Sequence, residues 1–583
     1  MNHKTISKVI GVSPGVAIGK AFVQRRIEWE FIEQDVSIGL ANEELEKLLQ
    51  GVVRAKLELE QLKRSAGQWM QEEQLAIFNA HSMILSDPVW IQEMQDLILQ
   101  QHKSAVWAVK ETSEAYIMRF REMNDDYMRE RAVDVQDIAD RLIRVLQGRP
   151  EDGYPVFDEP VILVTNELTP SQVAQMDPDN ILGIVAATGG ENSHAAIMAR
   201  AMEVPFVVLR QAKGIHRIQT GDLLAIDGGQ GQMFRNPAAD VLRRMRDLQS
   251  AAIRQRDQMR VWVNVPAVTR DGEKWELHAN IGSIKELELA LRTGADGVGL
   301  FRTEFLFMER ETLPSEEEQF EIYKEAVQLL KGKPLVIRTI DIGGDKVAPS
   351  LMLPKEQNPF LGYRAIRIAL DRPDLFRTQL RAILRAGAFG PVKCLLPMIS
   401  GIDELLRSKE IFAEVKEDLR IQSLLFDVDM QLGIMIELPA AVMQADDLAR
   451  EADFFSIGTN DLTQYMLAVD RMNEKIAHLF KPIHPAVVRA IAHVAQAAER
   501  NQIPISVCGE LAGDSTALPL WLGLGIRNLS MTATSILPLK QKLCSSERQS
   551  AVAKMPDWLR VRTADELRAQ LIEFSMLKGA FER

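Results

Sequence analysis

Charged and amide side chains recur at the ends of short apolar runs in the second half of the sequence. Guanidinium groups bind phosphate and carboxylate through paired hydrogen bonds, so several arginines in one place suit an anion that carries both groups. Two carboxylates together with ligand oxygens are a usual way in which proteins hold Mg²⁺. The residues are Arg302, Arg338, Asp341, Glu437, Asn460, Asp461 and Arg471.

Each residue of this set also has an ordinary structural explanation. A lone arginine after a strand is most often the partner of a surface carboxylate, and Glu437 and Asp461 could simply pair with neighbouring arginines. Their occurrence after several separate runs favours a site for an anion and a metal ion. Because a metal ion and arginines align a transferring phosphoryl group and stabilise its charge, the set predicts phosphoryl transfer.

Two further residues could take part directly in chemistry. Cys508 follows another of these runs; a lone cysteine is inert by default, but beside an anion site its thiol could donate a proton. His194 follows two glycines and a serine and opens an alanine-rich helical stretch, where free backbone N–H groups favour phosphate. A neutral imidazole can act as a nucleophile there, although a lone histidine at a helix start is more often structural.

The elements that must position these residues follow a regular pattern. From about residue 260, eight apolar runs alternate with helical stretches, which predicts a (β/α)₈ barrel with its active-site mouth at the carboxyl ends of the strands. An open doubly wound sheet is the alternative that the pattern leaves open. The runs are ELHANI, GVGLF, LVIRTI, CLLPM, LGIMIE, FFSIG, PISVCG and NLSM.

The first half of the chain has a different organisation. Leucines at helical spacing from residue 37 to 147 predict an inserted helical bundle of about four helices, with a break at Pro88. The runs PVILV, ILGIVAA, PFVVL and DLLAID predict a small α/β domain that contains a helix over 193–202, and the first twenty residues supply an extra strand. A charged helix from Ala238 to Met259 should connect this domain to the barrel. The predicted fold class is therefore multidomain α/β.

The composition of the chain argues against several classes of protein. The net charge of −12 and the pI near 5.5 argue against a nucleic-acid-binding protein. Three scattered cysteines without a CxxC pair indicate a reducing compartment, no disulfide framework and no structural zinc site. No signal peptide is evident, and the apolar run from Leu518 to Ile526 is too short to span a bilayer. We therefore expect a cytoplasmic protein without membrane insertion.

Long segments of the chain resemble Enzyme I of the bacterial phosphotransferase system, the phosphoenolpyruvate-protein phosphotransferase family of PEP-utilising enzymes. The segments run from residue 11 to past residue 530, so the resemblance covers essentially the whole chain. They are SPGVAIGKA, GGENSHAAIMAR, DGVGLFRTEFLFMER, IRTIDIGGDK, NPFLGYRAIRI, FFSIGTNDLTQYMLAVDR and VCGELAGD.

The resemblance implies that phosphoenolpyruvate phosphorylates His194 and leaves as pyruvate, with Cys508 protonating the enolate. A histidine of the carrier protein HPr would then accept the phosphoryl group, in sugar uptake or in a regulatory branch. The resemblance implies Mg²⁺ as the cofactor, held by Glu437 and Asp461, and a homodimer formed through the barrel. The residues implied to bind phosphoenolpyruvate are Arg302, Arg338, Asn460, Asp461 and Arg471.

The resemblance and the pattern together give the expected domains. Because His194 and the barrel residues belong to different domains, we expect the small domain to swing about its connections. The domains are the first part of the phosphohistidine α/β domain at 1–36, the helical HPr-binding insertion at 37–147, the second part at 148–236, a linker helix at 237–260, and the PEP-binding barrel with its dimer interface at 261–583.

Two positions depart from the family pattern. Asn192 stands where many relatives have threonine and looks like the nitrogen-linked branch, and Leu438 also varies; these differences leave the pathway open, but not the reaction. One alternative is an ATP-linked enzyme that resembles pyruvate phosphate dikinase or phosphoenolpyruvate synthase. It would need a large nucleotide-binding domain where the helical insertion stands. The other is a non-catalytic regulatory paralogue, which the intact Arg, Glu, Asp, His and Cys positions disfavour.

Overall fold

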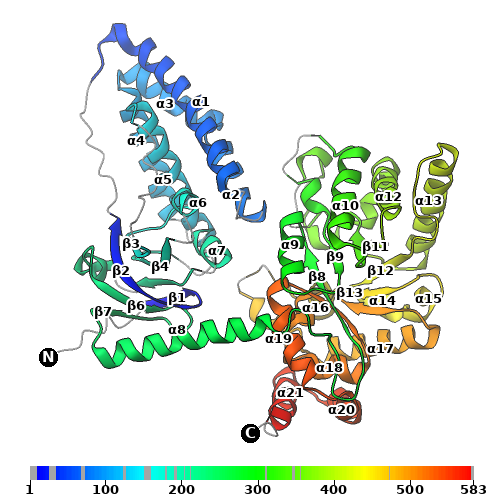
Figure 1. Cartoon of the computed structure of the whole chain (residues 1–583). Coiled ribbons are helices and arrows are strands. Elements are labelled where there is room, and N and C mark those ends of the chain that lie inside the picture. Colours follow the sequence, from blue (N-terminus) through cyan, green and yellow to red (C-terminus); the bar gives the residue numbers. More distant parts are fainter. Residues whose placement is uncertain are drawn as a thin grey trace. The chain divides into compact units, whose positions relative to one another are not determined.

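The chain forms two compact units, Met1–Gln255 and Arg256–Arg583, in the computed structural model (Figure 1). None of the helices in the described ranges combines the length and the apolar composition that a bilayer crossing requires. The structure describes residues 9–24, 35–66, 72–122, 126–149, 159–176, 180–189, 194–202, 204–209, 212–308, 312–344, 348–354, 356–471, 473 and 475–579.

A seven-stranded mixed sheet forms one part of the first unit, in the order β1-β5-β4-β3-β2-β6-β7. The strands from β2 to β5 pair in parallel, whereas β1, β6 and β7 pair antiparallel at the two sides. Four strands confirm the predicted runs. The start of the chain supplies two strands instead of the one expected, and β7 was not expected. The strands are β1 (Val9–Ser13), β2 (Val16–Gln24), β3 (Val161–Thr165), β4 (Ile181–Ala186), β5 (Phe206–Leu209), β6 (Leu223–Asp227) and β7 (Gln232–Arg235).

A helical bundle lies between β2 and β3 in the chain, with five helices where about four were predicted. The helical spacing is confirmed because Leu48, Val52 and Leu59 are all buried. Pro88 begins α3, and the Asp87 side chain caps it by accepting hydrogen bonds from the backbone nitrogens of residues 89 and 90. The bundle helices are α1 (Ala41–Ala66), α2 (Glu72–Ile84), α3 (Pro88–Gln101), α4 (Ala105–Glu122) and α5 (Asp126–Leu146), preceded by η1 (Ile38–Leu40).

The remaining helices of this unit are short except for the last. Two of them follow the ends of β3 and β4, and the helix expected over 193–202 is confirmed as α7. The charged helix expected near residues 238–259 is confirmed as α8, in which Met245 is fully buried. These elements are α6 (Pro170–Gln175), α7 (His194–Ala201), η2 (Ala212–Arg217) and α8 (Ala239–Arg260).

Eight parallel strands close into a barrel in the second unit, which confirms all eight predicted runs and excludes the open sheet. The apolar core lies mainly between strands and surrounding helices, and a smaller cluster that includes Leu300, Leu395 and Met435 lies apart from it. The strands are β8 (Glu276–Ile281), β9 (Val298–Phe301), β10 (Leu335–Arg338), β11 (Val392–Leu396), β12 (Leu432–Ile436), β13 (Phe455–Ile457), β14 (Ile505–Val507) and β15 (Asn528–Met531).

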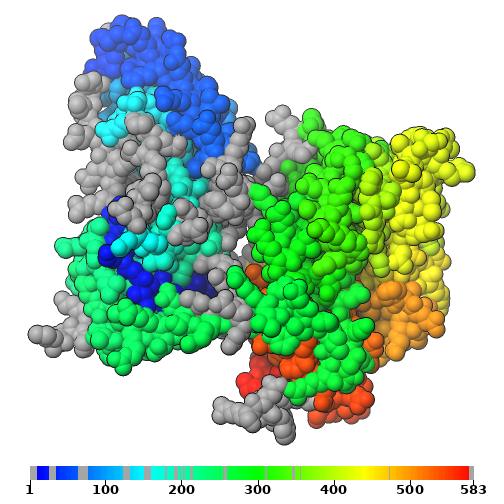
Figure 2. Space-filling model, viewed as in Figure 1, coloured from blue at the N-terminus to red at the C-terminus, as the bar shows by residue number. Residues whose placement is uncertain are grey.

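Helices cover the barrel and complete one continuous body, drawn from green to red in the space-filling view (Figure 2). They are α9 (Ile284–Arg292), η3 (Glu304–Leu306), α10 (Glu316–Leu330), η4 (Pro349–Leu351), η5 (Pro359–Leu361), α11 (Ile366–Asp371), α12 (Pro373–Gly387), α13 (Ile402–Ile421), α14 (Pro439–Met443), α15 (Ala445–Ala449), α16 (Thr459–Leu467), η6 (Ala477–Leu479), α17 (Pro485–Asn501), η7 (Glu510–Gly513), α18 (Leu518–Leu524), α19 (Ala533–Cys544), α20 (Arg548–Arg560) and α21 (Ala564–Gly579).

His278 on β8 makes barrel stability depend on pH. Burial lowers the pKa of this imidazole from 6.5 to about 4, so between these values the unfolded chain binds a proton that the folded chain does not. Stability should therefore fall by about 2 kcal/mol from this residue as the pH drops from about 7 to about 5. Urea unfolding of wild type and His278→Gln at both pH values measures this loss. The exposed His493 supplies the control His493→Gln, and equal pH dependence in all three proteins would contradict the prediction.

Candidate functional site

The predicted polar residues gather at one end of the barrel because its strands are parallel. Arg338 is the last residue of β10, and Arg302 and Glu437 directly follow β9 and β12. Asn460 and Asp461 lie in the first turn of α16, just after β13. Carboxyl ends of parallel strands open on the same mouth, so these side chains share one site.

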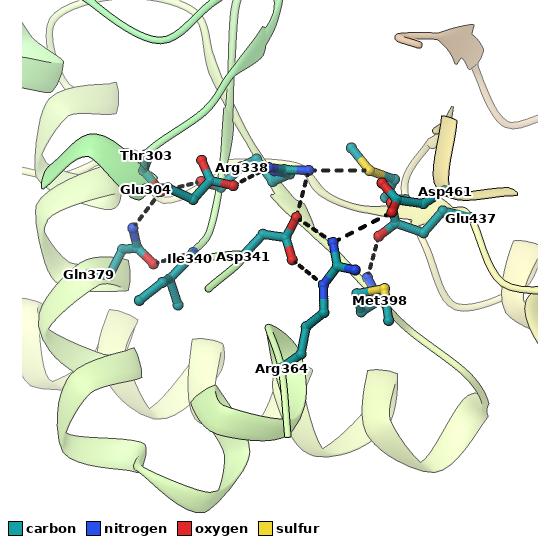
Figure 3. Close-up of polar contacts among 11 residues, drawn as sticks. Thr303, Glu304, Arg338, Ile340, Asp341, Arg364, Gln379, Met398, Glu437 and Asp461 are labelled. Atoms are coloured by element: carbon teal, nitrogen blue, oxygen red, sulfur yellow. Dashed lines mark hydrogen bonds and ion pairs between the residues drawn. The ribbon is translucent and has the colours of Figure 1, made fainter. Parts of the chain in front are cut away.

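A buried ion network crosses this mouth (Figure 3). Arg338 pairs with Glu304, and its Nη1 lies 3.2 Å from Asp341 Oδ2. Arg364 binds both oxygens of Asp341, from Nε at 2.9 Å and from Nη2 at 3.1 Å. The same Nη2 lies 3.6 Å from Asp461 Oδ1. The arginines and carboxylates therefore hold one another in place, because a buried charge is tolerated only when it is paired.

Glu437 is fully buried at the centre of the predicted metal site. Its Oε1 accepts a hydrogen bond of 2.6 Å from the backbone nitrogen of Met398. Burial, reinforced by the negative charge of Asp461, raises the pKa of this carboxyl well above its ordinary value. A β-carbon on Gly458 would lie 2.9 Å from Glu437 Oε2, so only glycine leaves that oxygen its space. The carboxylate is thus held where an additional positive charge would favour its ionised form.

Four buried atoms of the predicted charged residues at the mouth have no hydrogen-bond partner among the described residues, a rare state for buried polar atoms. Two are carboxylate oxygens, which suit a cation, and two are guanidinium nitrogens, which suit an anion. The described part of the chain contains no group of three or more His, Cys, Asp or Glu residues arranged to hold a metal ion, so the two carboxylates would need ligand oxygens to complete a metal shell. The atoms are Glu437 Oε2, Asp461 Oδ1, Arg338 Nε and Arg471 Nη1.

The remaining mouth residues differ in how tightly they are held. Asn460 and Glu510 exchange two hydrogen bonds of 3.2 Å, whereas Arg302 is exposed. Cys508, directly after β14, is buried. Burial raises the pKa of its thiol to about 11, although the positive charge of Arg338 opposes the shift. The thiol is therefore protonated at neutral pH and can donate that proton.

His194 is the first residue of α7 in the other unit. The helix is fixed there because Ala196 and Ala199 are fully buried and Arg200 donates a hydrogen bond of 3.0 Å to the carbonyl of Val12. Residues 190–193, including Asn192, lie outside the described residues. A cavity of about 520 Å³ opens where β3 and β4 end, and Thr188 on its wall precedes the segment that leads to His194.

Three buried polar residues of the barrel were not singled out from the sequence. Glu304 and Arg364 belong to segments that carry the family resemblance, DGVGLFRTEFLFMER and NPFLGYRAIRI, and this membership was the available signal. Gln379 on α12 hydrogen-bonds the backbone nitrogen of Ile340 and the hydroxyl of Thr303, and no sequence pattern pointed to it.

The barrel mouth and the separate histidine-bearing unit define the class of PEP-utilising enzymes. The family model of the PEP-binding domain of these enzymes matches residues 256–548, half of the chain. The models of their N-terminal domain and of their mobile domain match residues 8–131 and 157–231.

Within this class the chain belongs to the phosphoenolpyruvate-protein phosphotransferases. It is 41% identical to the phosphoenolpyruvate-protein phosphotransferase of Geobacillus stearothermophilus over 97% of both chains. It is 40% identical to that of Bacillus subtilis, over 96% of this chain and 98% of the relative. The protein of the same name from Staphylococcus carnosus is also 40% identical, over 92% and 93%.

The Arg364–Asp341 pair should be important for the stability of the barrel. Arg364→Met leaves a buried carboxylate with less compensation and should destabilise the protein by about 3–5 kcal/mol. The double variant Arg364→Met/Asp341→Leu should recover part of this loss, because one positive and one negative charge are then removed together and the net charge of the buried network is unchanged. Urea unfolding measures the stability of the single and the double variant.

The surface pair of Arg372 and Asp374, with a separation of 3.4 Å, provides the matched control. Arg372→Met should change stability by less than about 1 kcal/mol, because exposed ion pairs contribute little. Equal costs for Arg364→Met and Arg372→Met would show that the buried network does not stabilise the barrel.

Proposed function

We propose that the chain transfers the phosphoryl group of phosphoenolpyruvate to its own His194, releases pyruvate, and passes the group to a histidine of the carrier protein HPr. The observation that carries this proposal is the set of buried carboxylate and guanidinium atoms at the barrel mouth that have no hydrogen-bond partner among the described residues. Phosphoenolpyruvate has a phosphate and a carboxylate, the two groups that arginines bind best. The names and full-length coverage of the relatives support the same reaction.

Each mouth residue has a role in this proposal. Glu437 and Asp461 hold Mg²⁺, which when bound supplies positive charge against the transferring phosphoryl oxygens. The donor set supports this role, since both ligands are carboxylates and each has an oxygen without a hydrogen-bond partner among the described residues. The residues that bind phosphoenolpyruvate are Arg302, Arg338, Asn460, Asp461 and Arg471.

Cys508 is the proton donor in this proposal. Loss of the phosphoryl group leaves an enolate, which must gain a proton on its terminal carbon to become pyruvate. A thiol with a pKa near 11 keeps its proton at neutral pH until the strongly basic enolate carbon forms. After pyruvate leaves, the thiolate regains a proton from water.

His194 serves as the relay between the two partners. It is the nucleophile that accepts the phosphoryl group, and the mobile domain carries it from the barrel to the carrier protein. The helical insertion at 37–147 docks HPr, and the barrel at 261–583 forms the homodimer. The parts at 1–36 and 148–236 make up the phosphohistidine domain, with the linker helix at 237–260 as the connection. The protein acts in the cytoplasm, in sugar uptake or in a regulatory branch.

Labelled phosphoenolpyruvate tests the central step. With Mg²⁺ present, wild type should take up label that is removed on addition of HPr, whereas His194→Ala should take up none, because no other residue of the proposal accepts the group. Gels of samples quenched and run at alkaline pH, where the P–N bond of phosphohistidine is stable, measure the label. The exposed His216 of the same unit supplies the control His216→Ala, which should be labelled like wild type. Label retained in His194→Ala would refute the proposed acceptor, and labelling from ATP would favour a dikinase.

Metal binding tests the proposed role of Glu437 separately from phosphoryl transfer. Glu437→Gln keeps the size of the side chain but removes its charge, and should weaken Mn²⁺ binding by at least about tenfold. Titration followed by electron paramagnetic resonance measures free Mn²⁺ with and without phosphoenolpyruvate. Glu410→Gln, at an exposed carboxylate of α13, is the control and should bind like wild type. Unchanged Mn²⁺ affinity in Glu437→Gln would place the metal elsewhere.

A further inference from the structure

The backbone around Cys508 is held from three sides. Its N–H donates a hydrogen bond of 3.0 Å to the carbonyl of Ile457, and its Sγ lies 3.5 Å from the same oxygen. A β-carbon on Gly509 would lie 1.8 Å from Thr459 Oγ1 and 2.7 Å from Thr459 N, so the next residue is pressed against the start of α16. The third contact comes from farther away in the barrel.

Asn280 on β8 makes that third contact, although β15 lies between β8 and β14 in the barrel. Its Nδ2 donates a hydrogen bond of 2.8 Å to the carbonyl of Cys508. Its Oδ1 accepts a hydrogen bond of 2.6 Å from Oγ of Ser530, which is fully buried on β15. A carbonyl can only accept, so the amide nitrogen of Asn280 must face Cys508 and the amide oxygen must face Ser530. The Ser530 hydroxyl therefore fixes the orientation of the Asn280 amide, and that amide in turn fixes the carbonyl of Cys508.

We propose that Asn280, held by Ser530, is a positioning residue that aims the Cys508 thiol at one face of the enolate and so decides which face of C3 receives the proton. The inference rests on the proposed function of Cys508. In the step itself the S–H bond breaks, its electron pair stays on sulfur, and the proton bonds to C3 through the electrons of the enolate double bond. Asn280 does not touch the reacting atoms; it fixes the strand end from which the thiol projects.

Stereochemistry is the sensitive readout, because a residue that only stabilises the fold would not alter it. (Z)-2-phosphoenolbutyrate carries a methyl group on C3, so its reaction in deuterium oxide gives 2-oxobutyrate with a new stereocentre. Wild type should give one configuration. Asn280→Asp removes the N–H donor and places a carboxylate against a carbonyl, so it should give a mixture. Its single-turnover phosphorylation of His194 should fall by less than about tenfold, a smaller effect than the loss of stereospecificity.

Ser530→Ala is the second variant. It removes the hydroxyl that holds Asn280 but leaves Asn280 itself unchanged, so the proposal can still be tested if Asn280→Asp unfolds at a lower temperature than wild type. It should also give a mixture, whereas Ser530→Thr keeps the hydroxyl and should restore one configuration. Asn528→Ala is the matched control. Asn528 lies on β15 opposite Ser506, two residues before the level of Cys508, and its side chain bonds Glu276 of β8 at 3.0 Å and not Asn280. It should give one configuration.

The outcomes separate this inference from the function on which it rests. One configuration from wild type, Asn280→Asp and Ser530→Ala alike would overturn the positioning role while leaving Cys508 as the donor. A mixture from wild type would overturn the donor role of Cys508, and with it the inference. A mixture from Asn528→Ala as well would show that any disturbance of the β8–β15 pair suffices, and would overturn the specific role of Asn280.

Discussion

The paired binding of Arg364 to Asp341 is the contact on which the barrel mouth depends. It joins the segment after β10 to the segment before α11, and through the 3.6 Å approach to Asp461 it reaches α16. Arg364 also donates to the hydroxyl of Tyr465, on the same helix as Asp461. The next residue, Ala365, has φ of 53°, a conformation that an alanine adopts only when its surroundings enforce it. The positions of many residues at the mouth thus follow from the need to give the buried guanidinium group of Arg364 its hydrogen-bond and ion-pair partners.

The same burial has opposite consequences for two acids at this mouth. It raises the pKa of both Glu437 and Cys508, because a low-dielectric surrounding penalises either anion. The carboxyl has a buried oxygen without a hydrogen-bond partner in the described chain, so a cation can restore its charge. The thiol instead stays neutral, as its proposed role as a proton donor requires. In the proposed function, the same burial therefore suits one acid to a metal ion and the other to proton donation.

Most of the fold could be predicted from the sequence, because its signals are local. Apolar runs between helical stretches predicted all eight barrel strands, and Asp87 and Pro88 carry the chemistry of a helix start in two adjacent residues. Strand-end positions predicted Arg338, Glu437 and Asp461 because parallel strands share an edge. The rest depends on long-range contacts. Arg364 and Glu304 act as partners of buried charges, and Gln379 reaches the mouth from a helix. The four-residue strand β7 is too short to show alternation.

The helical bundle occupies a particular place in the topology. It connects β2 to β3, and these two strands are parallel neighbours in the sheet. Parallel neighbours cannot be joined by a tight turn; the chain must return across the sheet before the second strand begins. The bundle is thus an enlarged crossover connection, not a module attached to a loop. Deleting the bundle would leave only residues 25–37 and 147–160 to connect β2 to β3, whereas exchanging it for the bundle of a relative would keep the whole connection. The bundle can therefore be exchanged as one whole crossover, because its two ends lead to neighbouring strands of the sheet.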